Sequence, residues 1–337
     1  MAEIPSTSPG LTQSKPYPPT VAALGGLPTV GLDVPITAVF LVLFLCSAVT
    51  HMTILQRNNR RGHKFVISGA LFGFSMARIT TCVLRIVWAT RPHQAPVGIA
   101  AAVFVAAGVL LVFVINIIFT QRIIRAVHPH FGWNPFASRL LIVYWVAIVL
   151  SLAMLITCTV QSFFTLHPNT RRIDRDVQLF GTTWLTIAAF MPWLLVPAAL
   201  LIPHRNRIEN FGSGRFRTKV AVLLTASAVL TLGAAFRCGT LFLPPRPINN
   251  PAWYHSKACF YLFDFTTEVF VLYLYAIARV DRLFWIPNGS SGPGDYAAGH
   301  AGKEGAPFRG RNDEEQFDEA PESRTVEQEK ERPFQRA

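Results

Sequence analysis

The chain has 337 residues, of which 51% are hydrophobic and only 15% are charged. Soluble domains carry about 25% charged residues, so this composition argues against a soluble protein and indicates a membrane protein. The formal net charge is +12, but no soluble basic domain carries it, which argues against a nucleic-acid partner.

Residues 1–33 are rich in Pro, Ser and Gly and are predicted to form a disordered arm outside the cytosol. Seven apolar stretches follow, each near the roughly 20 residues that a helix needs to cross the hydrocarbon. They cover about 34–55, 65–89, 96–120, 139–163, 178–202, 218–242 and 256–280. We therefore expect an all-α fold, a seven-helix transmembrane bundle over 34–287. Residues 288–337, Gly-rich and then acidic, are predicted to form a disordered cytosolic tail.

The basic residues of the connections predict the orientation, because Lys and Arg concentrate in cytosolic loops. The connections on one side hold 14 basic residues and those on the other hold 7, so we expect the N-terminus outside and the C-terminus in the cytosol. We expect the two larger cytosolic loops to bind anionic lipids of the cytosolic leaflet, with a docking surface for a cytosolic signalling partner as the alternative. A plasma membrane location is favoured over internal membranes. The basic residues of these loops are Arg57, Arg60, Arg61, Lys64, Arg205, Arg207, Arg215, Arg217 and Lys219.

The seventh stretch is apolar enough to span a bilayer, yet it contains Asp264 and Glu268. A carboxylate at membrane depth costs several kcal/mol on insertion scales, so it is expected to have a partner or a function. The two residues are four apart and therefore share one helix face. Arg78, Arg85 and Arg237 are the candidate partners in the second and sixth stretches.

The direction of each span predicts which of these charges lie at the same depth. Glu268 matches Arg78, and Asp264 matches either Arg85 or Arg237. Arginine suits such a pairing because its fork can hold a carboxylate through two hydrogen bonds. Three cations face two anions, which leaves one positive charge for an anionic ligand, a lipid phosphate or water. The alternatives are a structural lock between three helices, a ligand or substrate site, and a proton-coupling role.

The remaining polar and sulfur-containing residues indicate no catalytic chemistry. Asn116 is expected to make a hydrogen bond between helices in the central, small-residue-rich third stretch. The nine histidines form no HExxH or helical HxxxH pattern, and GxSxG, P-loop and GxGxxG motifs are absent. We therefore expect no metal, no cofactor and no enzymatic activity. The five cysteines favour free thiols, with a disulfide between Cys238 and Cys259 as the alternative.

Several segments together resemble a known family. They are HMTILQRNNRRGHKF (51–65), GFSMARITTCVLRIVWA (73–89), INIIFTQRIIRAVHP (115–129), RRIDRDVQLFG (171–181), LGAAFRCG (232–239) and WYHSKACFYLFDFTTEVFVLYLYAIARVDRLFWIP (253–287). Over about 35–288 the chain resembles a fungal family of seven-helix membrane proteins of unknown function. Members are sometimes labelled G-protein-coupled-receptor-like, and they are broadly similar to fungal lipid-translocating exporter-like proteins. The resemblance implies no activity or site residue.

Two functions fit these observations. The first is a receptor-like or sensor protein that binds a small-molecule or lipid ligand in a pocket between the second, third, sixth and seventh spans. The basic cytosolic loops would then transmit the signal. The second is a transporter or lipid exporter that uses the same charges as its substrate site. Against it, seven spans do not divide into equal halves, and no internal repeat is evident.

Overall fold

The computed structural model describes residues 15–17, 19–203 and 208–296. Within them, seven helical segments are long and apolar enough to cross a membrane, which confirms the expected number. Five of the segments are single helices: α1 (Val30–Arg60), α2 (Val66–Thr90), α6 (Pro135–Ser162), α7 (Pro168–Leu201) and α8 (Phe216–Phe242). The third segment consists of α3 (Ala95–Gly108) followed by α4 (Leu110–Val127). The seventh consists of α9 (Lys257–Phe260), the π-helical turn η2 (Tyr261–Thr266) and α10 (Thr267–Ile277) in line.

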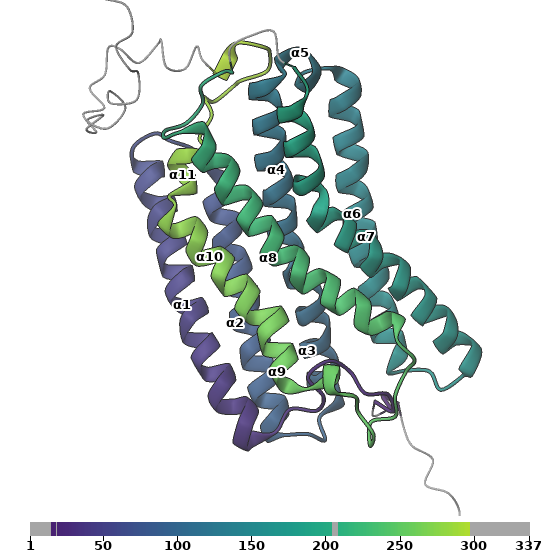
Figure 1. Cartoon of the computed structure of the whole chain (residues 1–337). Helices are drawn as coiled ribbons and strands as arrows, with labels where there is room; N and C mark the ends of the chain where they lie inside the picture. Colours follow the sequence, from purple (N-terminus) through teal and green to yellow (C-terminus); the bar gives the residue numbers. More distant parts are fainter. Residues whose placement is uncertain (1–14, 18, 204–207, 297–337) are drawn as a thin grey trace, which may run out of the picture. The chain divides into compact units, whose positions relative to one another are not determined.

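Short elements connect the spans. They are α5 (Pro129–Gly132), the 3-10 turn η1 (Trp253–His255) and α11 (Val280–Leu283). The described part of the chain contains no β-strand, only an isolated bridge between Val21 and Pro247. Figure 1 shows α3 and α9 at one end of the bundle and α5 and α11 at the other. We call them the α9 end and the α5 end.

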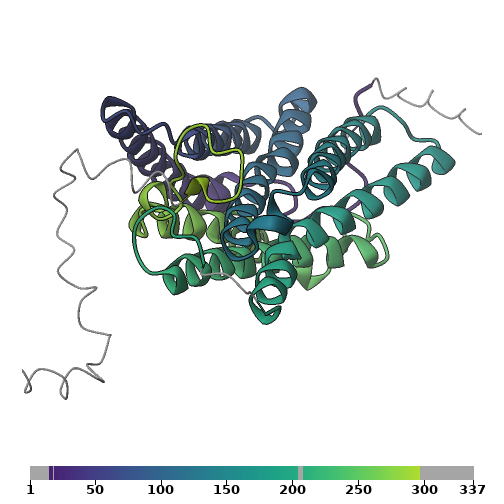
Figure 2. The same cartoon turned by 90° about the horizontal axis from the view of Figure 1, so that it is seen from above.

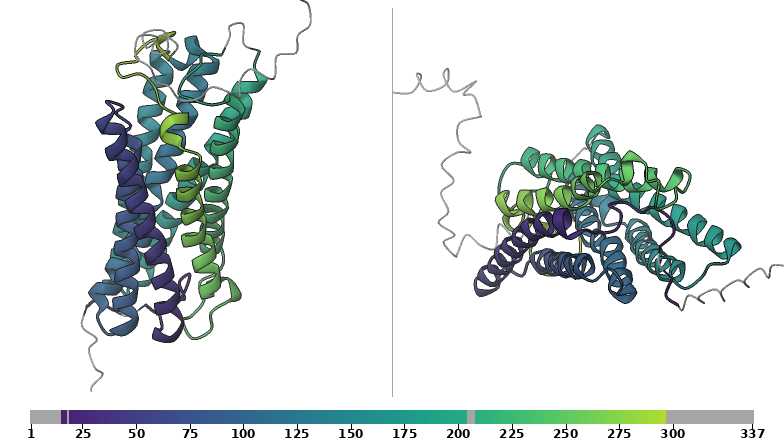
Figure 3. Two further views of the ribbon diagram at one scale, coloured as in Figure 1. Left: turned by 90° about the vertical axis from the view of Figure 1, so that its left-hand side faces the viewer. Right: turned by 90° about the horizontal axis from the view of Figure 1, so that it is seen from below.

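The continuous helix of α3 and α4 lies at the centre of the bundle. It contacts α2, α6, α7 and α8, while α1 packs on α2 and α10 at one side and α6 packs on α7 at the other (Figure 2). Figure 3 shows α10 between α1 and α8, both of which it contacts. Phe113, Phe119 and Ile123 of α4 are buried at this centre. The position agrees with the small side chains of α3, because small residues let helices approach closely.

Helix α7 is longer than predicted, since it begins at Pro168 and not near 178. Its first turns, PNTRRIDRDV, are too polar to register as a membrane span, but proline favours the first position of a helix. At 1.5 Å per residue its 34 residues extend for about 51 Å. This length exceeds the roughly 30 Å thickness of the hydrocarbon, so the polar first turns extend beyond it.

The prediction of a disordered N-terminal arm is wrong for residues 15–17 and 19–33. The backbone N–H of Tyr17 donates to the Phe163 carbonyl (2.8 Å), and that of Ala22 donates to the Arg246 carbonyl (2.8 Å). Residue Asp33 lies in the first turn of α1 and is 1% exposed. The segment is ordered because its backbone groups find partners at the α9 end. Residues 1–14 and 18 of the expected arm lie outside the described residues.

The predicted tail also begins with an ordered segment. Tyr296 is buried against Trp133 and Phe211, and the Gly294 N–H donates to Glu209 Oε1 (2.8 Å). The Ser291 and Gly292 N–H groups both donate to Asp295 at 2.7 Å, and these bonds hold the pKa of that carboxyl below its usual value. The prediction of disorder is therefore wrong for residues 288–296. Residues 297–337 lie outside the described residues.

The basic loop residues lie at the α5 end, but not all of them face solvent or lipid. Lys219 is buried, and its ammonium group donates to the carbonyls of Phe211 (2.6 Å) and Gly214 (3.2 Å). Its predicted contact with anionic lipid is therefore wrong, because the ammonium group is held inside the 211–219 loop. The other described members are exposed, and Arg205 and Arg207 lie outside the described residues. The exposed members are Arg57, Arg60, Arg61, Lys64, Arg215 and Arg217.

Candidate functional site

Arg78 and Glu268 form an ion pair at the centre of the bundle, as their matching depths predict. Both side chains are buried, and Arg78 Nη2 donates to Glu268 Oε1. Arg78 Nη1 also donates to the carbonyls of Phe104 (3.1 Å) and Val105 (3.2 Å) on α3. One guanidinium therefore joins α2, α3 and α10.

Gly108, the last residue of α3, makes room for this guanidinium. A Cβ atom at position 108 would lie 2.6 Å from Arg78 Cζ and 2.9 Å from Arg78 Nε. Such distances are too short for real Cβ contacts, and the guanidinium is held in place by Glu268 and two carbonyls. The glycine in this part of the third span is therefore required for the buried charge as well as for helix packing.

Arg237 on α8 pairs with Asp264, which confirms one of the two predicted alternatives. Arg237 Nη1 lies 2.8 Å from Asp264 Oδ1, and the Arg237 side chain is 21% exposed while Asp264 is buried. Asp264 belongs to the π-helical turn η2. Such turns are rare in proteins overall. Where they do occur, they are often found at functional sites, because the extra residue changes the direction of nearby side chains.

Arg85 does not pair with Asp264; it pairs with Asp33. Arg85 Nη2 lies 2.8 Å from Asp33 Oδ1, and Arg85 Nε donates to the Tyr261 hydroxyl (3.1 Å). The Lys257 ammonium and the Tyr261 hydroxyl also donate to the Asp33 carboxylate. The predicted count of three cations and two anions is therefore wrong: Asp33 adds a third carboxylate from the first turn of α1, and Lys257 adds a fourth cation. One positive charge is still in excess.

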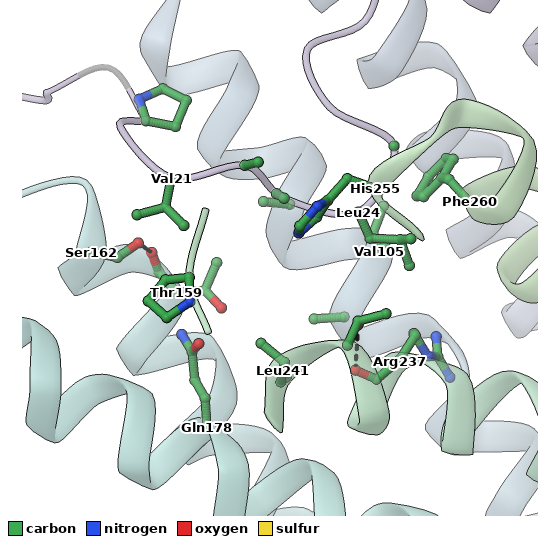
Figure 4. A pocket seen from close by; sticks show the side chains of 18 of the residues that line it. Val21, Leu24, Val105, Thr159, Ser162, Gln178, Arg237, Leu241, His255 and Phe260 are labelled. Carbon is green, nitrogen blue, oxygen red and sulfur yellow. Dashed lines mark hydrogen bonds between the residues drawn. The ribbon is translucent and has the colours of Figure 1, made fainter. Parts of the chain in front are cut away.

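A large cavity of about 1290 Å³ lies at the α9 end, and Arg85, Arg237 and Asp264 are part of its wall. Side chains of α3, α6, α7 and α8 surround it, together with the segment 19–27 and the 243–256 connection (Figure 4). The cavity wall thus combines predicted charged residues of the spans with residues that the sequence places in the N-terminal arm and in the connections between spans. Arg78 and Glu268 are not among its lining residues.

The cavity is long and has an apolar inner end. Its lining extends along α7 from Arg171 to Thr186, which is about 22 Å at 1.5 Å per residue. Val109, Phe113, Leu155 and Leu185 form the inner end, and each of these side chains is buried. Among the residues that the structure describes, no lining residue comes from the loops at the α5 end.

Helix α7 places three arginines and two aspartates at the outer end of the cavity, so its contribution to the charge there is positive. Arg171 donates to Thr20 Oγ1 (2.9 Å) and the Thr165 carbonyl (3.0 Å), and Arg175 donates to the carbonyls of Leu241 (3.2 Å) and Leu243 (2.9 Å). These acceptors are neutral, and within the described ranges no carboxylate forms an ion pair with Arg171, Arg172 or Arg175. From the sequence alone, the three are expected only as loop charges. Arg175 follows Arg172 by three residues and Arg171 by four, and this spacing is the signal that could have placed it beside both of them on a helix.

His255 at the cavity wall lies outside the membrane-spanning segments. Burial lowers its pKa below the usual value, and the nearby positive charge of Arg246 lowers it further. The ring is therefore neutral at pH 7, and its Nδ1 accepts a hydrogen bond from the Ala252 N–H (3.2 Å). His255 shapes the wall and adds no charge to it.

The other predicted polar residue, Asn116, lies between helices as expected. The Tyr275 hydroxyl of α10 donates to Asn116 Oδ1 of α4, and both residues are buried away from the cavity. All five cysteines are free, which confirms the favoured alternative. In the described ranges no group of three His, Cys, Asp or Glu side chains has the arrangement of a metal site.

One comparison with known proteins gives a match. Residues 212–285 are similar to a family described as "Protein of unknown function (DUF3112)". This segment contains α8, α9, η2, α10 and α11, and so it holds Arg237, Asp264 and Glu268. No curated protein and no solved structure matches the chain. The match agrees with the expected domain of unknown function over this segment alone, and it assigns no activity.

Proposed function

We propose that the chain is a receptor-like membrane protein that binds a ligand in the cavity at the α9 end. The supporting observation is a large cavity with a closed, apolar inner end and charged side chains in its wall. Sites for small molecules are typically about 300–1,000 Å³ and mostly apolar, with a few placed polar groups. The cavity of about 1290 Å³ exceeds this range, so it could hold a lipid-sized ligand.

The ion pairs prepare the cavity for binding before a ligand arrives. Asp33 of α1 holds Arg85 of α2, and Asp264 of η2 holds Arg237 of α8. Because each pair joins two elements that pack against each other, it holds an arginine of the cavity wall in place. A preformed site avoids the cost of ordering its side chains on binding.

The orientation belongs to the same proposal. The six exposed basic loop residues named above lie at the α5 end, and the rule that positive loops face the cytosol puts that end inside. The cavity then faces the outside, where a receptor meets its ligand. The exposed loop residues would bind anionic leaflet lipids or a cytosolic partner. We place the protein in the plasma membrane for this reason.

A transporter or lipid exporter remains the alternative function. It requires a second conformation in which the cavity opens toward the α5 end. The buried side chains of Val109, Phe113, Leu155 and Leu185 close that route in this conformation. The closed inner end therefore favours a receptor over a transporter, and neither function needs a catalytic group.

Sided labelling of a cysteine in the cavity tests the proposal. We expect Gln178→Cys, made in a background whose five cysteines are alanine, to react with a membrane-impermeant maleimide on intact cells, since Gln178 lines the cavity. Arg61→Cys at the α5 end is the matched control and should react only after permeabilisation. In inside-out vesicles Gln178→Cys should stay unlabelled.

Each other result contradicts a named part of the proposal. Labelling of Arg61→Cys alone on intact cells would reverse the orientation. If both sites react only after permeabilisation, the plasma membrane location is wrong. Labelling of Gln178→Cys from both faces would favour the transporter. A Gln178→Cys that never reacts while Arg61→Cys does would show that the cavity is closed to outside reagents.

A further inference from the structure

The cavity differs in chemistry from one end to the other. We infer that its ligand is an anionic amphiphile, whose phosphate-like headgroup binds Arg171, Arg172 and Arg175 and whose apolar chain lies along the inner end. This inference rests on the proposed function, because it names the ligand class of the same cavity. Three observations support it: the net charge of the outer end, the position of that end in the bilayer, and hydroxyl groups further in that already donate to backbone carbonyls.

The charge of the outer end favours an anion. Arg171, Arg172 and Arg175 lie within two turns of α7 and share the cavity wall. Arg171 and Arg175 donate to neutral oxygens, and within the described ranges no carboxylate forms an ion pair with any of the three arginines. Asp174 and Asp176 of the same helix also line the cavity, so three cations face two anions there and one positive charge is left over. Guanidinium groups bind phosphate oxygens through two parallel hydrogen bonds, so three together form a phosphate-type site.

The depth of this end matches a lipid headgroup. Helix α7 exceeds the hydrocarbon thickness by about 20 Å, and its first turns carry the three arginines. They therefore lie at the level of the headgroups, while Leu185 lies about 15 Å further along the helix, at hydrocarbon depth. A molecule aligned with the lipids would place its charge and its chain against the matching parts of the wall.

The inner part of the cavity suits a chain that makes no hydrogen bonds. The hydroxyl groups of Thr159, Thr182 and Thr186 line it, but each donates to a backbone carbonyl of its own helix at 2.7–2.8 Å. They present methyl groups and already satisfied hydroxyls to the cavity. Val105, Val109 and Phe113 complete an apolar wall, against which burial of a methylene chain is favourable.

Binding of three probes to the purified full-length protein in maltoside micelles tests the inference. The probes are hexadecyl phosphate, hexadecanol and inorganic phosphate, and the readout is the dissociation constant by native mass spectrometry. We expect hexadecyl phosphate to bind at least about tenfold more tightly than either of the others, because a charge-assisted hydrogen bond is worth about 1.5–3 kcal/mol. Inorganic phosphate has the anionic group without the chain, and hexadecanol has the chain without the anionic group. Their affinities therefore show whether the headgroup or the chain accounts for binding.

Two pairs of variants locate the binding. Arg172→Gln should weaken hexadecyl phosphate binding about tenfold, while Arg91→Gln, an exposed arginine outside the cavity lining, should not. Ala106→Phe fills the cavity wall and should weaken both hexadecyl phosphate and hexadecanol. Ala153→Phe on the exposed face of α6 is its control. The melting temperature of each variant shows that it is folded.

The outcomes separate the ligand class from the proposed function. Unchanged binding to Arg172→Gln, or equal affinity for inorganic phosphate, would overturn the amphiphile. If hexadecanol binds as tightly as hexadecyl phosphate and only Ala106→Phe weakens it, the cavity is a binding site but not for an anion. If Ala106→Phe, with an unchanged melting temperature, alters the binding of no probe, both the ligand class and the function are wrong.

Discussion

Replacement of Glu268 by glutamine is expected to destabilise the protein by about 3–5 kcal/mol, because it leaves the buried Arg78 charge without its carboxylate. Arg78→Met should have an effect of similar size, since Glu268 then keeps an uncompensated charge at the centre of the bundle. We would measure the free energy of unfolding of the full chain in mixed micelles. The abundance of each variant in the membrane gives an independent measure.

The double variant Arg78→Met with Glu268→Gln should recover most of the loss. An apolar side chain and a neutral amide carry no charge into the bilayer, so the main penalty of either single change is removed. Single variants as stable as the original protein would contradict the importance of the pair. A double variant no better than the worse single one would show that packing around Gly108, and not charge, dominates.

Replacement of Asp33 by alanine is expected to cost a similar amount, about 3–5 kcal/mol, through the loss of a partner for Arg85. Arg85 is almost fully buried, whereas Lys257, the other partner of Asp33, is partly exposed and can bind water instead. Most of the cost therefore comes from Arg85. The unfolding measurement in mixed micelles checks the value.

The matched control for Asp33→Ala is Asp176→Ala. Asp176 is an exposed carboxylate at the same end, and its replacement should change stability by no more than about 0.5 kcal/mol. The Asp33 variant should also become sensitive to protease within residues 19–27, because Arg85 links Asp33 to the Gly25 carbonyl (3.3 Å). Equal stability of the two variants would mean that Asp33 is not part of the membrane charge network.

Sequence reasoning located the central ion pair but not the cavity. The pairing of Arg78 with Glu268 follows from depth alone, since both lie near the middle of unambiguous apolar spans. Asp33 falls immediately before the predicted start of the first span, so it was assigned to a disordered arm. A carboxylate in the first turn of α1, where it accepts the Thr29 N–H (2.7 Å), is the signal that could have placed it.

The arginines of α7 were missed for a related physical reason. Apolar stretches mark only the part of a helix inside the hydrocarbon, whereas Arg171, Arg172 and Arg175 lie on turns that extend past it. The cavity itself depends on how the ends of α3, α6, α7 and α8 diverge and on where residues 19–27 cross them. No local pattern in the sequence encodes that arrangement, because it comes from tertiary packing.

The structure of the full chain in lipid nanodiscs, determined by electron cryo-microscopy with and without hexadecyl phosphate, tests the central claim most directly. The account predicts added density in the cavity, with the phosphate within hydrogen-bond distance of Arg172 or Arg175 and the chain against Val109 and Phe113. A cavity without added density, while the probe occupies the outer surface of the bundle, would contradict it.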